Sequence, residues 1–313
     1  MYNEYSAYAP ASIGNVSVGF DCLGLCLEAP GDTVRVREIA ETGKLYIRSI
    51  EGDGGKLSYK ISENVCGLVA AKLLEAAGSN IGLEIHIQKG LPLKSGMGSS
   101  AASSAAVAVA LNALLGEPFQ KEELLPFVLE GEKLAGGAPH ADNAAPCLLG
   151  GIRLIPAGDT LKSLALTYPP ELCIALLHPN IDIATRQARE ILPQTVPLST
   201  AVYQSSALAA FVHGLAHGDW ELIAISMRDY LAEPVRKSLI PHFPDLKASA
   251  LESGALNFGI SGSGPAVFAL CRDIGSAHKV AGVMEAVLSS RNIAAESFVS
   301  RINTKGTRIL GEN

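Results

Sequence analysis

The first 90 residues carry the alternation of apolar and polar positions that half-buried β-strands require. In residues 82–88, Leu83, Ile85 and Ile87 fall on one face, and the residues between them are polar. The same period of two predicts strands over residues 33–39, 45–50 and 82–88. Strands are therefore expected to dominate the N-terminal part of the chain.

Other segments repeat their apolar residues every three or four positions, which is the spacing of an amphipathic helix. In one of them, Val65, Leu68, Val69 and Leu73 share a face, and Gly78 follows as a plausible stop. This spacing predicts helices over residues 64–78, 99–115, 121–136, 185–192, 199–217, 219–232 and 276–290. Short apolar runs predict further strands over residues 150–156, 171–179, 265–271 and 296–302.

The order of these elements favours an α+β fold, because strands and helices are mixed without a regular βαβ rhythm. The chain has 313 residues, more than a single hydrophobic core usually serves. We therefore expect two domains, an N-terminal one over residues 1–165 and a C-terminal one over residues 166–313.

Composition and charge exclude several classes of partner. The formal net charge is −6, which argues against binding to nucleic acid or to an anionic membrane. The longest apolar run contains several serines and Asn112, so it is a poor membrane span. The first ten residues carry an acid and no base, unlike a secretory signal. The six cysteines form no paired C-x-x-C motif, and most stand in apolar runs, which predicts a cytoplasmic protein without a structural zinc site.

A glycine-rich turn leads directly into the helix that begins near residue 99. Gly96 and Gly98 flank Met97, and two serines follow. The N-terminus of a helix has unpaired N–H groups and a partial positive charge, so it favours phosphate. The alternative is a tight turn whose small residues allow close packing and whose serines cap the helix. The turn alone leaves both interpretations open.

Two well-known phosphate loops do not fit this turn. No Gly-Lys-Ser or Gly-Lys-Thr occurs in the chain, so a Walker A loop is absent. The dinucleotide fingerprint G-x-G-x-x-G also fails, because Gly98 is followed by Ser-Ser-Ala. A nicotinamide-dependent enzyme is thus a weak alternative.

The pattern P-x-x-x-G-x-G-S-S-A-A in residues 92–102 resembles the phosphate-loop signature of a superfamily of small-molecule kinases. Its members are galactokinase, homoserine kinase, mevalonate kinase and phosphomevalonate kinase, and Met97 stands where they usually have leucine. Residues 9–24 resemble their N-terminal substrate motif, and residues 259–270 resemble their C-terminal glycine motif. With three motifs in the family's order, the chain is identified as a member of this superfamily.

Four stretches resemble the homoserine kinase branch: "SVGFD" (17–21), "PHADN" (139–143), "AREILP" (188–193) and "EPVRKSLIP" (233–241). An amino-acid acceptor suits their chemistry, because the guanidinium groups of Arg189 and Arg236 can bind a carboxylate in bidentate geometry. Asp21 can accept hydrogen bonds from an ammonium group or from the reacting hydroxyl. Neutral polar side chains suited to orienting the substrate are Asn15, His140 and Asn143.

The resemblance implies a two-domain kinase fold, with a left-handed βαβ unit in the N-terminal domain and a ferredoxin-like C-terminal domain. It places ATP at the domain junction, with Mg²⁺ on Ser100 and Glu132; Ser99 and Glu130 are the rival ligands. Asn64 and Lys89 match positions near the adenine. The phosphate loop supplies the remaining ATP-binding candidates: Pro92, Leu93, Lys94, Ser95, Gly96, Met97, Gly98, Ser99, Ser100, Ala101 and Ala102.

The implied reaction transfers the γ-phosphoryl group of ATP to the side-chain hydroxyl of L-homoserine, a step of threonine biosynthesis. Asp142 is the candidate base, although homoserine kinases of this pattern are thought to work without one, and Asn143 orients the hydroxyl. A homodimer is a further expectation. The alternatives are a related kinase for another acceptor, such as mevalonate, and a catalytically silent nucleotide sensor.

Overall fold

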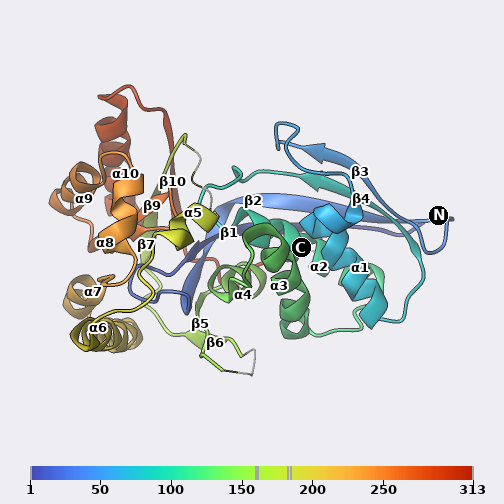
Figure 1. The fold of residues 1–313 in the computed structure, drawn as a ribbon, viewed down its shortest axis with the longest axis horizontal. Coiled ribbons are helices and arrows are strands. Elements are labelled where there is room, and N and C mark those ends of the chain that lie inside the picture. The colour runs from blue at the N-terminus through green and yellow to red at the C-terminus, as the bar shows by residue number, and fades with distance from the viewer. Residues whose placement is uncertain (1, 159–161, 182, 184, 312–313) are drawn as a thin grey trace.

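The computed structural model describes residues 2–158, 162–181, 183 and 185–311 (Figure 1). The strands are β1 (Glu4–Gly14), β2 (Leu23–Ile39), β3 (Leu45–Glu51), β4 (Gly82–Gln88), β5 (Ile152–Leu154), β6 (Leu164–Leu166), β7 (Cys173–Pro179), β8 (Asn257–Ile260), β9 (Val267–Cys271), β10 (Ala295–Arg301) and β11 (Arg308–Ile309). The helices are α1 (Val65–Ala76), α2 (Ser99–Leu114), α3 (Leu125–Gly136), α4 (Ala141–Leu149), α5 (Thr185–Glu190), α6 (Leu198–His217), α7 (Trp220–Ser226), α8 (Glu233–Arg236), α9 (Phe243–Glu252) and α10 (Ile274–Ser289).

The first sheet has the strand order β11-β1-β2-β4-β3, with β5 paired to β2 and β6 paired to β5. Helices α1, α2 and α4 pack against one face of it, and α3 packs against these three helices (Figure 1). Strands β3 and β4 are parallel and are joined through α1, so the predicted βαβ unit is present. Its left-handed sense stays a prediction. Leu83, Ile85 and Ile87 are buried, as the alternation in β4 predicted.

The second sheet has the order β10-β7-β9-β8, and all of its pairs are antiparallel. Along the chain, β7 is followed by helices, the hairpin β8–β9, helix α10 and β10. The sheet therefore runs fourth, first, third, second, which is the ferredoxin-like arrangement of a βαββαβ unit. The predicted α+β fold with two sheets is confirmed.

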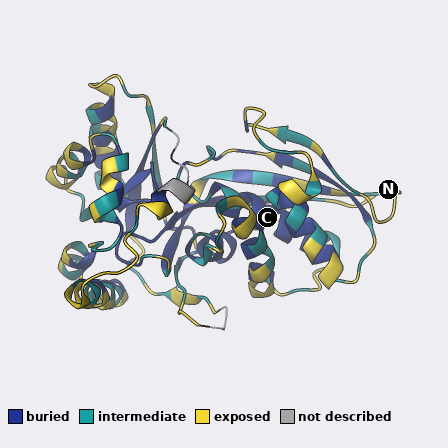
Figure 2. Cartoon of the chain, in the orientation of Figure 1, coloured by how far each residue is buried: buried dark blue, intermediate teal, exposed yellow. Residues whose placement is uncertain are grey.

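Strand β7 belongs to two cores, because its side chains alternate between the faces of the sheet. Ile174 and Leu176 join the large core that the first sheet shares with α1 to α4. Cys173, Ala175 and Leu177 face a smaller core with α9 and α10. The two sheets are thus packed together through one face of the second. Buried residues follow β1, β2 and the inner sides of the helices (Figure 2).

The domain division at residues 165 and 166 falls inside β6, and β11 returns from the C-terminal end to pair with β1. The division of the chain into 1–165 and 166–313 stays a prediction.

The helix predicted over 219–232 is wrong beyond Ser226, where α7 ends. Its continuation is diverted by Asp229, whose carboxylate accepts hydrogen bonds from the backbone N–H groups of Leu231, Ala232 and Glu233. An aspartate that binds N–H groups ahead of it competes with the helical pattern. The alternation rule also missed β1, because nearly all of its residues from Ala9 onward are buried on both faces.

Candidate active site

The three glycine-containing motifs meet in space. Gly262 donates its N–H to the carbonyl of Gly14 (3.1 Å), which joins the C-terminal motif to the N-terminal one. The Ser261 hydroxyl donates to the carbonyl of Gly96 (2.7 Å), which joins it to the phosphate loop. A Cβ on Gly96 would lie 2.6 Å from the Ser261 carbonyl oxygen, so this approach requires glycine.

A cavity of about 720 Å³ opens at this junction. The predicted site residues that line it are Asn15, Asp21, Asn64, Lys89, Leu93, Lys94, Ser95, Gly96, Gly98, Ser99, Ser100, Glu132, His140, Asp142, Asn143, Arg189 and Arg236. Pro92, Met97, Ala101 and Ala102 do not line it. Met97, Ala101 and Ala102 are fully buried in the core, so they anchor the loop by packing and do not contact the cavity.

The N-terminus of α2 opens into the cavity. Its N-cap is Gly98, in the left-handed region at φ 69°, and no side chain of the described residues caps the first turn. The N–H groups of that turn are therefore available to an anion. A Cβ on Gly98 would lie 2.1 Å from Ser12 Oγ, so the protein's own packing also requires glycine here. The packing interpretation of this turn is therefore supported, and phosphate binding stays a prediction.

Glu132 of α3 is buried in the wall of the cavity, with an exposed fraction of 4%. Burial raises the pKa of its carboxyl to about 7, and the hydroxyl of Ser100 acts in the opposite direction. Its Oε1 atom has no hydrogen-bond partner in the described part of the chain. A buried, unpartnered carboxylate oxygen beside a hydroxyl fits a hard divalent cation such as Mg²⁺. Glu130, the rival ligand, does not line the cavity.

Lys89 and Asn64 both make bonds inside the protein. The Lys89 ammonium pairs with Asp32 and donates to the carbonyl of Ser99 (3.0 Å) and the hydroxyl of Ser103 (2.8 Å). Asn64 caps α1 by accepting from a backbone N–H two residues ahead (2.9 Å).

Sequence reasoning missed Asp32. Asp32 lies on the same face of β2 as the buried Val34 and Val36. An acidic residue at a position that the alternation assigns to the core was the signal that could have identified it.

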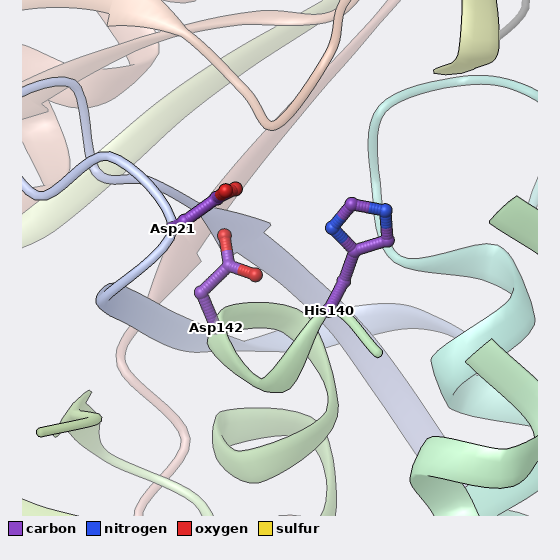
Figure 3. Close-up of side chains that lie close together, drawn as sticks. All are labelled: Asp21, His140 and Asp142. Atoms are coloured by element: carbon purple, nitrogen blue, oxygen red, sulfur yellow. The ribbon is translucent and has the colours of Figure 1, made fainter. Parts of the chain in front are cut away.

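At the other end of the cavity, Asp21 and Arg189 form a bidentate ion pair with N–O distances of 2.6 and 3.3 Å. Asp142 and His140, from the start of α4, lie beside Asp21, and one ligand atom from each of the three falls within 4.8 Å of the others (Figure 3). His140 Nε2 and Asp142 Oδ1 are buried without hydrogen-bond partners among the described residues. This end can therefore accept a positively charged group.

The turn that carries Asp21 is strained. Asn15, Val16 and Ser17 have φ values of 67°, 43° and 59°, in the left-handed region that side-chain-bearing residues rarely adopt. The Asn15 side chain holds the turn by donating to the Gly262 carbonyl (2.9 Å) and accepting from the backbone N–H of Asp21 (2.8 Å). Such strain is typical of functional sites that need one fixed geometry.

Arg236 is buried, whereas the side chain of Arg189 is 42% exposed. The Arg236 guanidinium donates from Nε to the Ala188 carbonyl (2.9 Å) and from Nη1 to the Gly262 carbonyl (3.1 Å). It thereby holds the backbone beside Arg189. Its Nη2 has no hydrogen bond within the described chain, so one edge remains for a ligand in the cavity.

Sequence reasoning also missed Gln204 of α6. Its buried side-chain amide donates to the Val18 carbonyl in the strained turn and accepts from the N–H of Tyr230 (2.8 Å). It therefore links this turn to the segment before Arg236. A lone glutamine in a helical pattern gives no signal for such a role.

Asp142 should make stability depend on pH. Burial, followed by the charge of Asp21, raises the pKa of its carboxyl to about 7, against 3.8 for an ordinary aspartate. The folded protein therefore keeps a proton that the unfolded chain loses above pH 4, so stability falls as pH rises to 7. Asp142→Asn removes this loss of stability. We expect the free energy of unfolding of the variant to exceed that of the parent by on the order of 2–4 kcal/mol at pH 8, and by little at pH 4. Urea unfolding at both pH values tests this, and an equal difference at both would contradict it.

Comparison with known proteins shows which family the chain resembles. The family models "GHMP kinases N terminal domain" and "GHMP kinases C terminal" match residues 64–151 and 210–290. A homoserine kinase of Chloroherpeton thalassium is 42% identical, covering 98% of this chain and 99% of that one. The crystal structure of homoserine kinase from Cytophaga hutchinsonii is also 42% identical and superposes with a TM-score of 0.96, covering 99% of this chain and 98% of that one. The mevalonate kinase of L. major, at 15% identity and a TM-score of 0.71 over 94% of this chain and 95% of that one, shares the fold.

Proposed function

Because the chain belongs to the homoserine kinase family of the GHMP kinases, we propose that it transfers the γ-phosphoryl group of ATP to the side-chain hydroxyl of L-homoserine. The observation that carries this proposal is the cavity itself. At one end it has an uncapped helix N-terminus, and at the other it has an acid and two arginines placed for a zwitterion.

The phosphate end is supplied by α2 and the loop before it. The free N–H groups of the first turn bind the β- and γ-phosphates, and the partial positive charge of the helix favours them. Ser100 and Glu132 would hold Mg²⁺, because a hydroxyl and an unpartnered buried carboxylate suit a hard cation. When bound, the metal neutralises charge that develops between the two phosphates.

The acceptor end fits an amino acid. Asp21 and Arg189 bind each other at this end of the cavity. A zwitterion replaces both halves of that pair, because its ammonium group binds Asp21 and its carboxylate binds Arg189 and the free edge of Arg236. An uncharged acceptor has neither an ammonium group to bind Asp21 nor a carboxylate to bind Arg189. The amide of Asn143 lies beside the phosphate loop, bonded to Ser12 (3.1 Å), and it orients the hydroxyl.

Transfer forms a bond from the homoserine oxygen to the γ-phosphorus and breaks the bond to the bridging oxygen of ADP. Positioning and charge neutralisation supply most of the catalysis, since the transition state is loose. Asp142 remains the candidate acceptor of the hydroxyl proton. Its Oδ1 is unpartnered, and with a pKa of about 7 it is partly ionised at neutral pH.

A screen of ADP release tests the function against both alternatives. The acceptors are L-homoserine, mevalonate, galactose, L-serine and L-threonine, each with ATP and Mg²⁺. We expect homoserine to exceed mevalonate and galactose at least about a hundredfold in kcat/KM, because neither carries the ammonium group that Asp21 would bind. We expect L-serine and L-threonine to be at least about tenfold poorer than homoserine, because their hydroxyl stands one carbon closer to the ammonium group. A preference for mevalonate would identify a related kinase. ATP binding without ADP release for any acceptor would identify a nucleotide sensor.

We propose a cytoplasmic location, which the six unpaired cysteines support, since disulfides are rare in reducing compartments. No helix in the described residues is both long enough and apolar enough to cross a membrane. The homodimer stays a prediction.

A further inference from the structure

A buried ion pair lies against the first turn of α2, and its acidic partner has none of the roles given so far. Lys89 follows the end of β4, Asp32 lies in β2, and their side chains are 2% and 0% exposed. The ammonium group also donates to the hydroxyl of Ser103 and to the carbonyl of Ser99. All three donors of Lys89 are therefore used inside the protein.

Asp32 connects three segments through one carboxylate. Its Oδ1 accepts from the backbone N–H groups of Gly90 (3.0 Å) and Leu91 (3.1 Å), where the phosphate loop begins. Its Oδ2 accepts from the hydroxyl of Ser103 in α2 (2.7 Å) and from Lys89. The start of the loop and the start of α2 are thus both held to β2.

Stability alone is a weak reason for such a pair. Moving two charges out of water removes most of what their attraction gains, and an apolar pair of similar volume often serves the fold equally well. Lys89 and Ser103 line the cavity, whereas Asp32 stands behind them and does not. The pair lies where a small displacement of α2 would move the N–H groups that face the cavity.

We propose that Asp32 is a positioning residue for ATP. Through Lys89 and the hydroxyl of Ser103, it holds the first turn of α2 in the register that binds the triphosphate. This inference rests on the proposed kinase function. It assigns to Lys89 a role directed inward, toward Asp32 and α2.

The test removes both charges together. Asp32→Asn alone leaves a buried cation unpaired, and the variant can lose stability for that reason. The double variant Asp32→Asn/Lys89→Met has no unpaired charge, and its side chains stay close in size to those they replace, so its melting temperature should return close to that of the parent. We expect its KM for ATP, and its Kd for MgATP measured without homoserine, to stay raised about tenfold, because misplaced binding groups lose affinity even in a folded protein. Its KM for homoserine should stay within about twofold of the parent.

Glu84→Gln is the matched control. Glu84 is another poorly exposed carboxylate of the same sheet, paired with Arg37 and Arg48 at 2.6 Å each, and it does not line the cavity. The MgATP affinity of the Glu84→Gln variant should equal that of the parent. A double variant that recovers both its melting temperature and its MgATP affinity would overturn the proposal, because the pair would then serve folding only. A parent protein that fails to bind MgATP would overturn the kinase function, and this inference with it.

Discussion

Glu132→Gln is expected to lower kcat at least about a hundredfold, since the metal contributes several kcal/mol of charge stabilisation in the transition state. The variant keeps the size of the side chain but loses the charge that would hold Mg²⁺. Its fold should be unchanged, because Oε1 of Glu132 bonds to nothing in the described protein. Steady-state kinetics over a titration of Mg²⁺ measures the effect, and the circular dichroism spectrum checks the fold.

Glu130→Gln is the control for this variant. Glu130 lies two residues earlier in α3, outside the cavity lining, so its loss should leave kcat within about twofold of the parent. If Glu132→Gln reaches normal turnover at saturating Mg²⁺, the metal ligand has been assigned to the wrong residue. The kinase function would then still stand on the acceptor screen.

Arg236→Ala is expected to lower kcat/KM for homoserine about a hundredfold, the upper end of what a charge-assisted contact contributes. The effect is large because the buried guanidinium does two things. It offers a free edge to the substrate carboxylate, and it binds the Ala188 carbonyl beside Arg189. Arg236→Lys should recover little, because an ammonium group cannot make these bonds in the planar geometry of a guanidinium.

Arg189→Ala should lose less, about tenfold, because its side chain is partly exposed and already paired with Asp21. Two controls distinguish acceptor binding from general damage. Affinity for ATP without homoserine should be unchanged in both variants. With 3-aminopropan-1-ol, which lacks the carboxylate, neither substitution should reduce the remaining activity much further. An unchanged KM for homoserine in both variants would refute the acceptor assignment.

Local patterns in the sequence predicted most of the elements and the chemistry of the loop. The alternation in residues 82–88 requires a strand with one apolar face, and β4 has these bounds. The turn with Gly96 and Gly98 leads to a helix at Ser99, as the change from small flexible residues to alanine and leucine predicts. Both features depend on residues within one or two turns of each other, so short-range patterns suffice.

The motifs also supplied most of the residues around the cavity, although they did not give the contacts among them. Asp21 and Arg189 are 168 positions apart and form an ion pair only because the fold brings the turn between β1 and β2 next to α5. The sequence offered Asp21 and Arg189 as separate candidates for binding the acceptor, with nothing to indicate that they contact each other. Asp32 and Gln204 carried no motif, and their bonds to distant backbone groups depend on packing alone.

What the sequence by itself determined is therefore the kind of chemistry: a helix N-terminus for phosphate, carboxylates for cations and arginines for a carboxylate. The tertiary structure decided which groups are charged, paired or free. Asp142 and Glu132 have pKa values near 7 because the folded chain removes water from around them. Desolvation depends on every element that packs against a side chain. The linear sequence does not show which elements these are.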